Sequence, residues 1–188
     1  MSNQKLIPPH GGYKKLESYK AAVIIYDGTV FFCDRYMTYT ANKSYRTCDQ
    51  MVQAARSGKQ NIAEGSLASG TSKKTELKLI GVTRASFGEL LEDYEDFLRQ
   101  RGLRLWRKDS PQARKVRSLA YTSHKSYTTY KTYIENKDPG IAANTLICIT
   151  HQANYLLDQQ LRALEKEFLE KGGFTKRLYL SRQEARRK

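Results

Sequence analysis

A thiol, an imidazole and a carboxylate are the groups of this chain whose spacing could support chemistry. Cys148 and His151 are three residues apart, so on a helix they would share one face, as a thiol nucleophile and its general base must. Glu64 could contribute the carboxylate of the same site. The commoner meaning of such spacing is a helical residue beside the core. We therefore expect no catalytic residues, with an unfamiliar enzyme site around these three residues as an alternative.

Metal and cofactor chemistry lacks its usual patterns in the sequence. No two histidines or cysteines have the spacing of a metal site, and neither a phosphate-cradling glycine loop nor a serine-hydrolase elbow is present. We therefore expect no bound metal and no cofactor. An odd set of scattered cysteines is typical of reduced thiols in the cytoplasm, where we expect the protein to be located. The residues concerned are His10, His124, His151, Cys33, Cys48 and Cys148.

Positive charge is the strongest signal in the composition. The 188 residues include 33 Lys and Arg against 19 Asp and Glu, a net charge of +14. Self-repulsion of this size opposes compaction and favours a partner such as nucleic acid, an anionic membrane or an acidic protein. The most apolar stretch, Ala21 to Tyr26, is too short to span a bilayer and is followed by Asp27. We therefore expect no membrane partner and favour nucleic acid.

The positive charge lies mainly in two segments, with a further net charge of +5 on residues 1–60. Residues 103–137 carry nine basic and two acidic side chains, a net charge of +7, and residues 172–188 carry six and one, a net charge of +5. Residues 61–102 and 138–171 have net charges of −1 and −2. Segregation of this kind is typical of an electrostatic binding face. The cations that we expect to contact RNA or DNA are Arg104, Arg107, Lys108, Arg114, Lys115, Arg117, Lys125, Lys131, Lys176, Arg177, Arg182, Arg186 and Arg187.

Aromatic residues alternate with the cations of the first basic segment, at Trp106, Tyr121, Tyr127, Tyr130 and Tyr133. Rings beside cations suit single strands or RNA, whose bases can stack on them. Packing of the segment onto the rest of the protein is the alternative use of the same rings. If six cations of this segment contact phosphates, the log–log slope of affinity against salt should be about −4 to −5.

Hydrophobic periodicity predicts an all-α protein, with no competing strand pattern. Apolar residues recur at steps of three and four along four long segments, which are separated by polar breaks. Four such helices with short links and one longer crossover are typical of an antiparallel up-down four-helix bundle. The helices are expected at residues 13–40, 48–63, 73–101 and 139–171.

The expected bundle, residues 13–171, contains a basic crossover, residues 103–137, between its third and fourth helices. Residues 1–12 are expected to form a flexible leader and residues 172–188 a basic C-terminal tail. Pro111 is expected to start a short helix over residues 112–121. Small residues of the second helix, Gly58 among them, should allow a close approach of another helix. Glu64 is expected to be a buried or half-buried hydrogen-bonding residue that fixes the turn to the third helix.

Residues 50–94 resemble a bacterial four-helix-bundle family, first noticed as open reading frames in intervening sequences of large-subunit ribosomal RNA genes. The accessory variability proteins of diversity-generating retroelements belong to the same family. The resemblance covers residues 13–102 well and the last helix loosely, and the crossover and tail look like the branch with a four-helix-bundle suffix. The matching residues are Asn61, Ile62, Ala63, Glu64 and Gly65, then residues 53–57, 84–86 and 89–90, with Tyr26 and Thr29.

The resemblance implies an antiparallel four-helix bundle that assembles into a ring-like homopentamer. For the retroelement members it implies a basic surface that binds nucleic acid and a reverse transcriptase as partner, and it implies no catalytic residues. Asn61, Glu64 and Gly65 would form a structural motif. We therefore expect a non-enzymatic nucleic-acid-binding accessory or assembly protein that acts as a homo-oligomer. The rival expectation is a protein-interaction scaffold whose basic face docks an acidic partner without binding nucleic acid.

Overall fold

The structure, a computed structural model, describes residues 6–37, 46–122 and 125–187. Every regular element in this part of the chain is helical, which confirms the prediction of an all-α protein. None of these helices is long and apolar enough to cross a membrane. The elements in chain order are η1 (Tyr13–Lys15), α1 (Glu17–Phe32), η2 (Cys33–Met37), α2 (Arg46–Ala68), α3 (Lys73–Gln100), α4 (Pro111–Ser118), η3 (Leu119–Tyr121), α5 (Tyr127–Ile134), α6 (Pro139–Lys171) and α7 (Phe174–Arg186).

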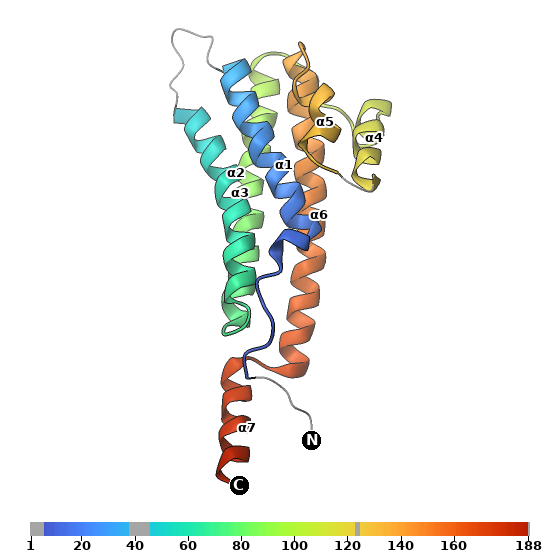
Figure 1. The fold of residues 1–188 in the computed structure, drawn as a ribbon. Helices are drawn as coiled ribbons and strands as arrows, with labels where there is room; N and C mark the ends of the chain where they lie inside the picture. The colour runs from blue at the N-terminus through green and yellow to red at the C-terminus, as the bar shows by residue number, and fades with distance from the viewer. Residues whose placement is uncertain (1–5, 38–45, 123–124, 188) are drawn as a thin grey trace.

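Helices α1, α2, α3 and α6 lie side by side along the long axis of the molecule (Figure 1). α1 packs against α2 and α6, and α3 packs against the same two helices, so the four surround one core. The longest of them is α6, whose 33 residues span about 50 Å at 1.5 Å per residue. α4 and α5 pack against it, and α7 follows its C-terminal end.

Aromatic rings fill the part of the core where α1 meets α3. Phe32 is tilted edge-on to Tyr94 and Phe97, with ring centroids 5.0 and 4.7 Å apart. The Tyr94 hydroxyl donates a hydrogen bond to Thr29 Oγ1 at 2.9 Å, and the Thr29 hydroxyl donates to the Ile25 carbonyl at 2.7 Å. These bonds satisfy the buried hydroxyls of Tyr94 and Thr29. Burial raises the pKa of Tyr94 well above its ordinary value, so the phenol remains a neutral donor.

Glycine allows α2 and α3 to approach closely. A Cβ atom on Gly58 would lie 2.3 Å from Cε1 of Phe87, so only glycine leaves room for that ring. Thr83 of α3 donates a hydrogen bond to the Gly58 carbonyl at 3.3 Å. Gly65, two turns further along α2, is buried against the backbone of Glu76. The expected close approach through the small residues of α2 is therefore present.

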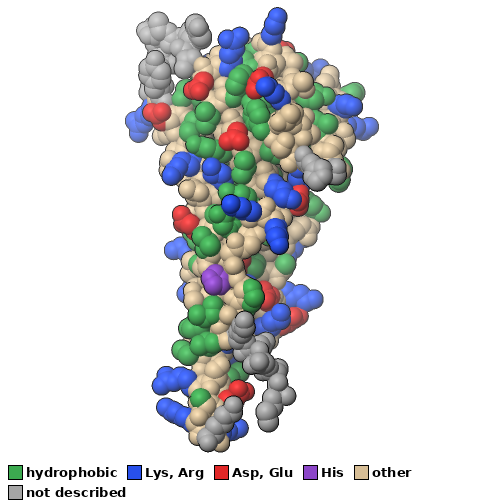
Figure 2. Space-filling view, in the orientation of Figure 1, with side chains coloured by type: hydrophobic (Ala, Val, Ile, Leu, Met, Phe, Trp, Pro, Cys, Tyr) green, Lys and Arg blue, Asp and Glu red, His purple; other side chains and the backbone are tan. Residues whose placement is uncertain are grey.

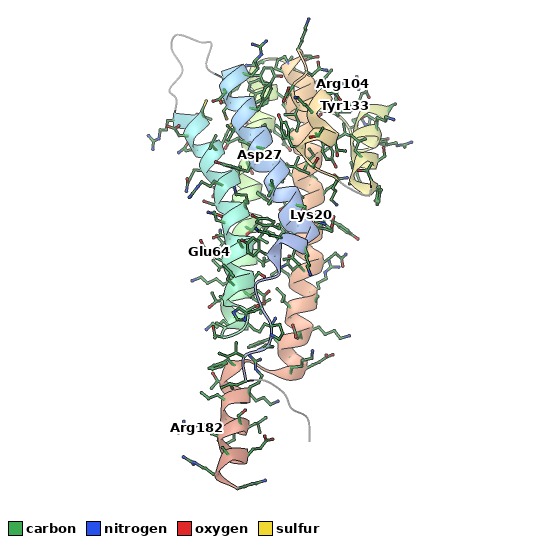
Figure 3. The ribbon with its side chains drawn as sticks, in the orientation of Figure 1. Lys20, Asp27, Glu64, Arg104, Tyr133 and Arg182 are labelled. Atoms are coloured by element: carbon green, nitrogen blue, oxygen red, sulfur yellow. The ribbon has the colours of Figure 1, made fainter. Side chains whose placement is uncertain are left out.

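The expectation that α2 ends beside Glu64 is wrong. α2 continues to Ala68, and Glu64 is exposed on the helix surface, where its side chain points away from α6 (Figure 3). The turn follows Ala68, and Ser72 caps α3 by accepting the Thr75 N–H at 3.2 Å. Gly65 does not end α2, because glycine inside a helix costs only about 0.5–1 kcal/mol relative to alanine. Its packing against α3 offsets that cost.

The first long helix is shorter than the sequence predicts. Residues 13–15 form a separate 3-10 turn, because Leu16 has an extended backbone with φ −70° and ψ 130°. The α-helix then runs over Glu17–Phe32 and passes into a π-helical turn at Cys33–Met37. The remainder of the expected helix, residues 38–40, lies outside the described residues.

Helices α4 and α5, within residues 103–137, are folded onto the long helices. α4 packs against α6, and α5 packs against both α6 and α1. Ala113 and Val116 of α4 are buried, as are Tyr130 and Ile134 of α5. The short helix predicted after Pro111 is present, whereas α5 adds to the expected elements. α5 thus covers one side of α1.

The C-terminal tail forms α7, which projects beyond the lower end of the long helices (Figure 1). Gly172 ends α6 with a left-handed φ of 70°, and its N–H bonds to the Phe168 carbonyl at 2.9 Å. At the start of α7, the Arg177 guanidinium donates hydrogen bonds to the carbonyls of Leu6 and Gly70, at 3.3 and 3.0 Å. The first turn of α7 is therefore tied to the turn between α2 and α3.

The described part of the leader, residues 6–12, lies along the end of α2. The Gly11 N–H donates to the Ser66 carbonyl at 3.1 Å, and the Leu6 carbonyl accepts the bond from Arg177. These contacts hold residues 6–12 against the body of the protein. The sequence does not predict these contacts, because one partner is the backbone carbonyl of Ser66 and the other is the distant side chain of Arg177.

Candidate nucleic-acid interface

α4 is an amphipathic helix with a buried apolar face and an exposed cationic face. Ser110 caps the helix by accepting the Ala113 N–H at 3.2 Å, and Pro111 occupies the first turn. Ala113 and Val116 are three residues apart, so they share the face that packs on α6. Arg114 lies on the opposite side and is exposed. The helix therefore buries its small apolar face and directs its cations to solvent.

Two side chains of α6 hold the backbone around α4. Asn144 is buried, donates to the Arg104 carbonyl at 2.9 Å and accepts the Trp106 N–H at 2.7 Å. Gln152 donates to the Arg117 carbonyl at 3.0 Å. The segment before α4 and its last turn are thus both fixed to the same helix. The sequence does not mark Asn144 or Gln152 as partners of this backbone, because their partners lie 35 or more positions away.

Five exposed cations surround this support, and we call them the α4 patch. Among the described residues, only Arg107 of the five forms an ion pair, with its Nε 3.7 Å from Asp109 Oδ1 and the two side chains 78% and 66% exposed. An exposed pair of this length contributes little stability and neutralises little of the charge. Figure 2 shows Lys and Arg side chains over this upper part of the molecule. The α4 patch consists of Arg104, Arg107, Lys108, Arg114 and Lys115.

Three other predicted site residues of the crossover are engaged within the protein. Lys125 Nζ lies 2.5 Å from Glu17 Oε2, and its side chain is only 14% exposed. Its hydrogen bond, together with that of Lys20, lowers the pKa of Glu17. Lys131 forms a longer pair, at 3.9 Å, with a glutamate one turn further along. The Arg117 guanidinium donates to a backbone carbonyl of the segment before α4. Lys125 and Arg117 thus hold residues 103–137 together, whereas the long and exposed pair of Lys131 contributes little.

The predicted cations of the tail divide in the same way. Arg177 is half-buried, and its guanidinium donates hydrogen bonds to two backbone carbonyls. Figure 3 shows Arg182 on the outer side of α7. The four exposed cations of this helix, which we call the α7 patch, form no ion pair with a described residue. They are Lys176, Arg182, Arg186 and Arg187.

The α4 and α7 patches lie at different levels of the molecule. Gln152 holds α4, whereas α7 begins after the end of α6 at Lys171. The 19 residues between them correspond to about 30 Å of helix at 1.5 Å per residue. Because the Debye length is about 8 Å at physiological ionic strength, each patch acts electrostatically as a separate site.

Most rings of the crossover serve packing. Tyr130 is buried, while Trp106, Tyr127 and Tyr133 are partly buried against the core. Burial raises the pKa of Tyr130 to about 12. Tyr121 differs from the other four, since it is 90% exposed at the end of η3. Of the five rings considered for base stacking, the structure therefore leaves one open to solvent.

The residues considered for catalysis differ in burial and lie on two helices. Cys148 is buried on α6, and burial raises the pKa of its thiol to about 11, which disfavours the nucleophilic thiolate. His151 is exposed on the same helix, and Glu64 is exposed on α2, on the side away from α6. In the described part of the chain, no three His, Cys, Asp or Glu residues are arranged to hold a metal ion. Asn61, the remaining residue of the expected motif, is half-buried on α2.

A shallow groove lies between α2 and α3. Its volume is about 730 Å³. Burial raises the pKa of Asp93 in its lining, and the neighbouring carboxylates Asp96, Glu89 and Glu92 add to the rise. The sequence shows these acids as neighbours on one predicted helix, but it does not predict the groove. Its lining residues are Arg46, Asp49, Gln50, Gln53, Ala54, Ser57, Ser86, Glu89 and Asp93.

Comparisons with known proteins assign no function to this surface. No model of a protein family matches the chain, and no curated protein and no solved structure matches it. The resemblance to the intervening-sequence family therefore rests on the matching residues of α1, α2 and α3 alone.

Proposed function

We propose that this protein is a non-enzymatic nucleic-acid-binding accessory or assembly protein whose principal contact surface is the α4 patch. The observation that carries the proposal is an imbalance of charge on a fixed support. Arg104, Lys108, Arg114 and Lys115 are exposed and have no carboxylate partner among the described residues. A phosphate backbone is the polyanion that such a surface fits best.

The rigid backbone beneath the patch supports the same proposal. Asn144 and Gln152 bond to the backbone of the crossover and leave its cationic side chains to solvent. A binding surface that is already fixed loses less conformational entropy when it meets its partner. The basic segment is therefore held in a defined position on α6, while its cations remain exposed.

The architecture is proposed to be an antiparallel up-down four-helix bundle of α1, α2, α3 and α6, with the basic crossover between the third and fourth helices. The cycle of contacts among these helices supports it. Together with the resemblance of residues 50–94, this arrangement makes the protein similar to retroelement accessory variability proteins. A homo-oligomer, with five subunits as the family suggests, and a reverse transcriptase partner belong to the same proposal.

The rival function is a scaffold that docks an acidic protein on the basic surface. The two proposals differ in what a generic polyanion should do. Nucleic acid of any sequence should bind to a phosphate-contacting surface at low salt, and the affinity should fall linearly with salt on logarithmic axes. A surface shaped for one acidic protein has no reason to retain oligonucleotides.

The test is a titration of the full-length protein by fluorescence anisotropy, using labelled single-stranded RNA, single-stranded DNA and duplex DNA of about 20 units. Binding that weakens with salt is the expected result. If four cations of the α4 patch contact phosphates of a single strand, the log–log slope should be about −3. No binding to any of the three probes at low salt would overturn the proposal and favour the scaffold.

A further inference from the structure

We infer that the α4 patch binds single-stranded nucleic acid, with the ring of Tyr121 as a stacking platform for one base. This inference rests on the proposed function and adds the class of ligand and a residue that selects it. Tyr121 is the most exposed of the large apolar side chains in the described part of the chain, at 90%. It forms no hydrogen bond and no ring contact with a described residue, so the fold makes little use of it.

Tyr121 continues the outward face of α4. Arg114, Ser118 and Tyr121 follow one another at intervals of four and three residues, which places them along one helical face. All three are exposed, whereas Ala113 and Val116 face α6. The ring therefore stands in line with a cation of the patch, on the side of the helix that a ligand can reach.

The length of this face suits a short stretch of one strand. From Arg114 to Tyr121 the chain rises through the last turn of α4 and then through the 3-10 turn η3. At about 1.5 and 2.0 Å per residue, the rise is about 12 Å. Stacked nucleotides of one strand advance by about 3.4 Å each, so the face spans about three to four nucleotides.

The backbone around the ring is fixed, although the side chain is free. The Leu119 carbonyl accepts hydrogen bonds from the Thr122 N–H at 3.2 Å and from the Thr122 hydroxyl at 2.9 Å. On the other side, the Gln152 bond to the Arg117 carbonyl holds the last turn of α4. A base that stacks on Tyr121 therefore meets a ring that is attached to a fixed backbone.

An exposed ring favours a single strand over a duplex. Bases in a duplex are already stacked on their neighbours, so a surface tyrosine can reach them only after they are pulled out. Bases of a single strand are free to stack on an aromatic side chain, and each such contact stabilises binding substantially and without sequence preference. The cations alone would serve both ligands, so the ring is the feature that separates them.

The test compares the full-length protein with three variants, using three probes of about 20 units: oligo(dA), an abasic oligonucleotide of the same length, and a duplex. Tyr121→Ala removes the ring, and Tyr121→Phe retains it without the hydroxyl. Tyr155→Ala is the matched control, because Tyr155 is also exposed, at 63%, but lies on α6. Equal melting temperatures by circular dichroism establish that the variants are folded.

The expected result is that Tyr121→Ala weakens binding of oligo(dA) by about five-fold or more and leaves binding of the abasic probe unchanged. Tyr121→Phe and Tyr155→Ala should bind oligo(dA) as the wild type does. Equal oligo(dA) affinity of Tyr121→Ala and wild type would overturn the inference, as would an equal loss in Tyr155→Ala. Tighter binding of the duplex, unaffected by Tyr121→Ala, would overturn it while leaving nucleic-acid binding intact. Failure of the wild type to bind any probe would overturn the proposed function as well.

Discussion

The buried side-chain oxygen of Asn144 accepts the backbone N–H of Trp106 at 2.7 Å. The amide nitrogen of the same side chain donates to the Arg104 carbonyl at 2.9 Å and to the Gly140 carbonyl at 2.8 Å. One residue of α6 thus satisfies backbone groups on both sides of Leu105. This bridge sets where the segment before α4 lies, and with it the first cations of the α4 patch.

Replacing Asn144 by alanine should destabilise the protein by about 1–3 kcal/mol, because buried backbone groups of the crossover lose their partner. The free energy of unfolding, obtained from urea titrations followed by circular dichroism, measures the effect. Asn61→Ala is the control: Asn61 is only half-buried, and its replacement should change stability by less than about 0.5 kcal/mol. Equal stability of Asn144→Ala and wild type would show that the bridge is dispensable.

The sequence predicts those features that depend on local pattern. Pro111 with Ser110 before it marks the start of α4, because a proline is favoured in the first helical turn. Gly58, among small residues on α2, predicts a close helix approach. The clustering of cations in residues 103–137 and 172–188 likewise follows from composition alone.

Features that depend on contacts between residues far apart in the chain could not be predicted from the sequence. Lys125 looks like a nucleic-acid contact by its position in a basic segment, yet it pairs with Glu17, 108 positions away in the sequence. Tyr130 looks like a stacking ring, yet α5 buries it against the core. Glu64 is expected beside the end of the second helix, yet tertiary packing carries α2 past it to Ala68. In each case the partner that decides the outcome lies far along the chain.

Gly58→Ala should destabilise the protein by about 1–3 kcal/mol, because the added Cβ would lie 2.3 Å from Cε1 of Phe87 and force the ring or the helix to shift. Thermal unfolding followed by circular dichroism measures the loss. Gly81→Ala on α3 is the matched control, since a Cβ there meets nothing within 4 Å. Removing a glycine from a helix interior at that position should instead stabilise the protein by about 0.5–1 kcal/mol. Equal effects at the two glycines would contradict the tight contact at Gly58.

The pair of Glu17 and Lys125 should make stability depend on pH. Hydrogen bonds from Lys125, and then Lys20, lower the pKa of Glu17 in the folded protein. A carboxyl with a lowered folded pKa contributes stability that is fully present above its unfolded pKa, about 4.3, and is lost as the pH falls through the folded value. Lys125→Met should therefore melt at lower temperature than wild type at neutral pH and lose this difference in acid.

Solvent screens this pair, because the Glu17 side chain is 47% exposed, so the expected difference in melting temperature is about 1–3 °C. Lys131→Met is the control, since Lys131 lies 3.9 Å from its glutamate and is 57% exposed. Its melting temperature should equal that of wild type at every pH. A Lys125→Met difference that persists unchanged below about pH 3 would point to lost packing rather than lost charge.

The two cationic patches should contribute unequally to nucleic-acid binding. Arg114→Ala with Lys115→Ala removes two cations from the fixed support of α4, and each lost phosphate contact should reduce the log–log salt slope by about 0.7 on a single strand. Arg182→Ala with Arg186→Ala removes the same charge from α7, which projects from the body (Figure 1). We expect the larger loss of affinity in the α4 variant, measured by anisotropy at several salt concentrations. A larger loss in the α7 variant would move the principal contact surface to the tail.

Self-association should be visible in the mass of the protein in solution. Val82 on α3 is 41% exposed in the middle of a long helix, where a large apolar side chain is best covered by another subunit. Light scattering after size exclusion should therefore give a multiple of the 21.6 kDa chain, near five-fold for the proposed ring.

Placing charge on Val82 is the sharper test, because an unpaired carboxylate is costly to bury at an interface. Val82→Glu should shift the mass toward that of one chain. Leu169→Glu makes the same chemical change at a 76% exposed position near the end of α6 and should leave the mass unchanged. A wild-type mass of 21.6 kDa would exclude the oligomer while leaving the α4 patch, which lies within one chain, as a binding surface.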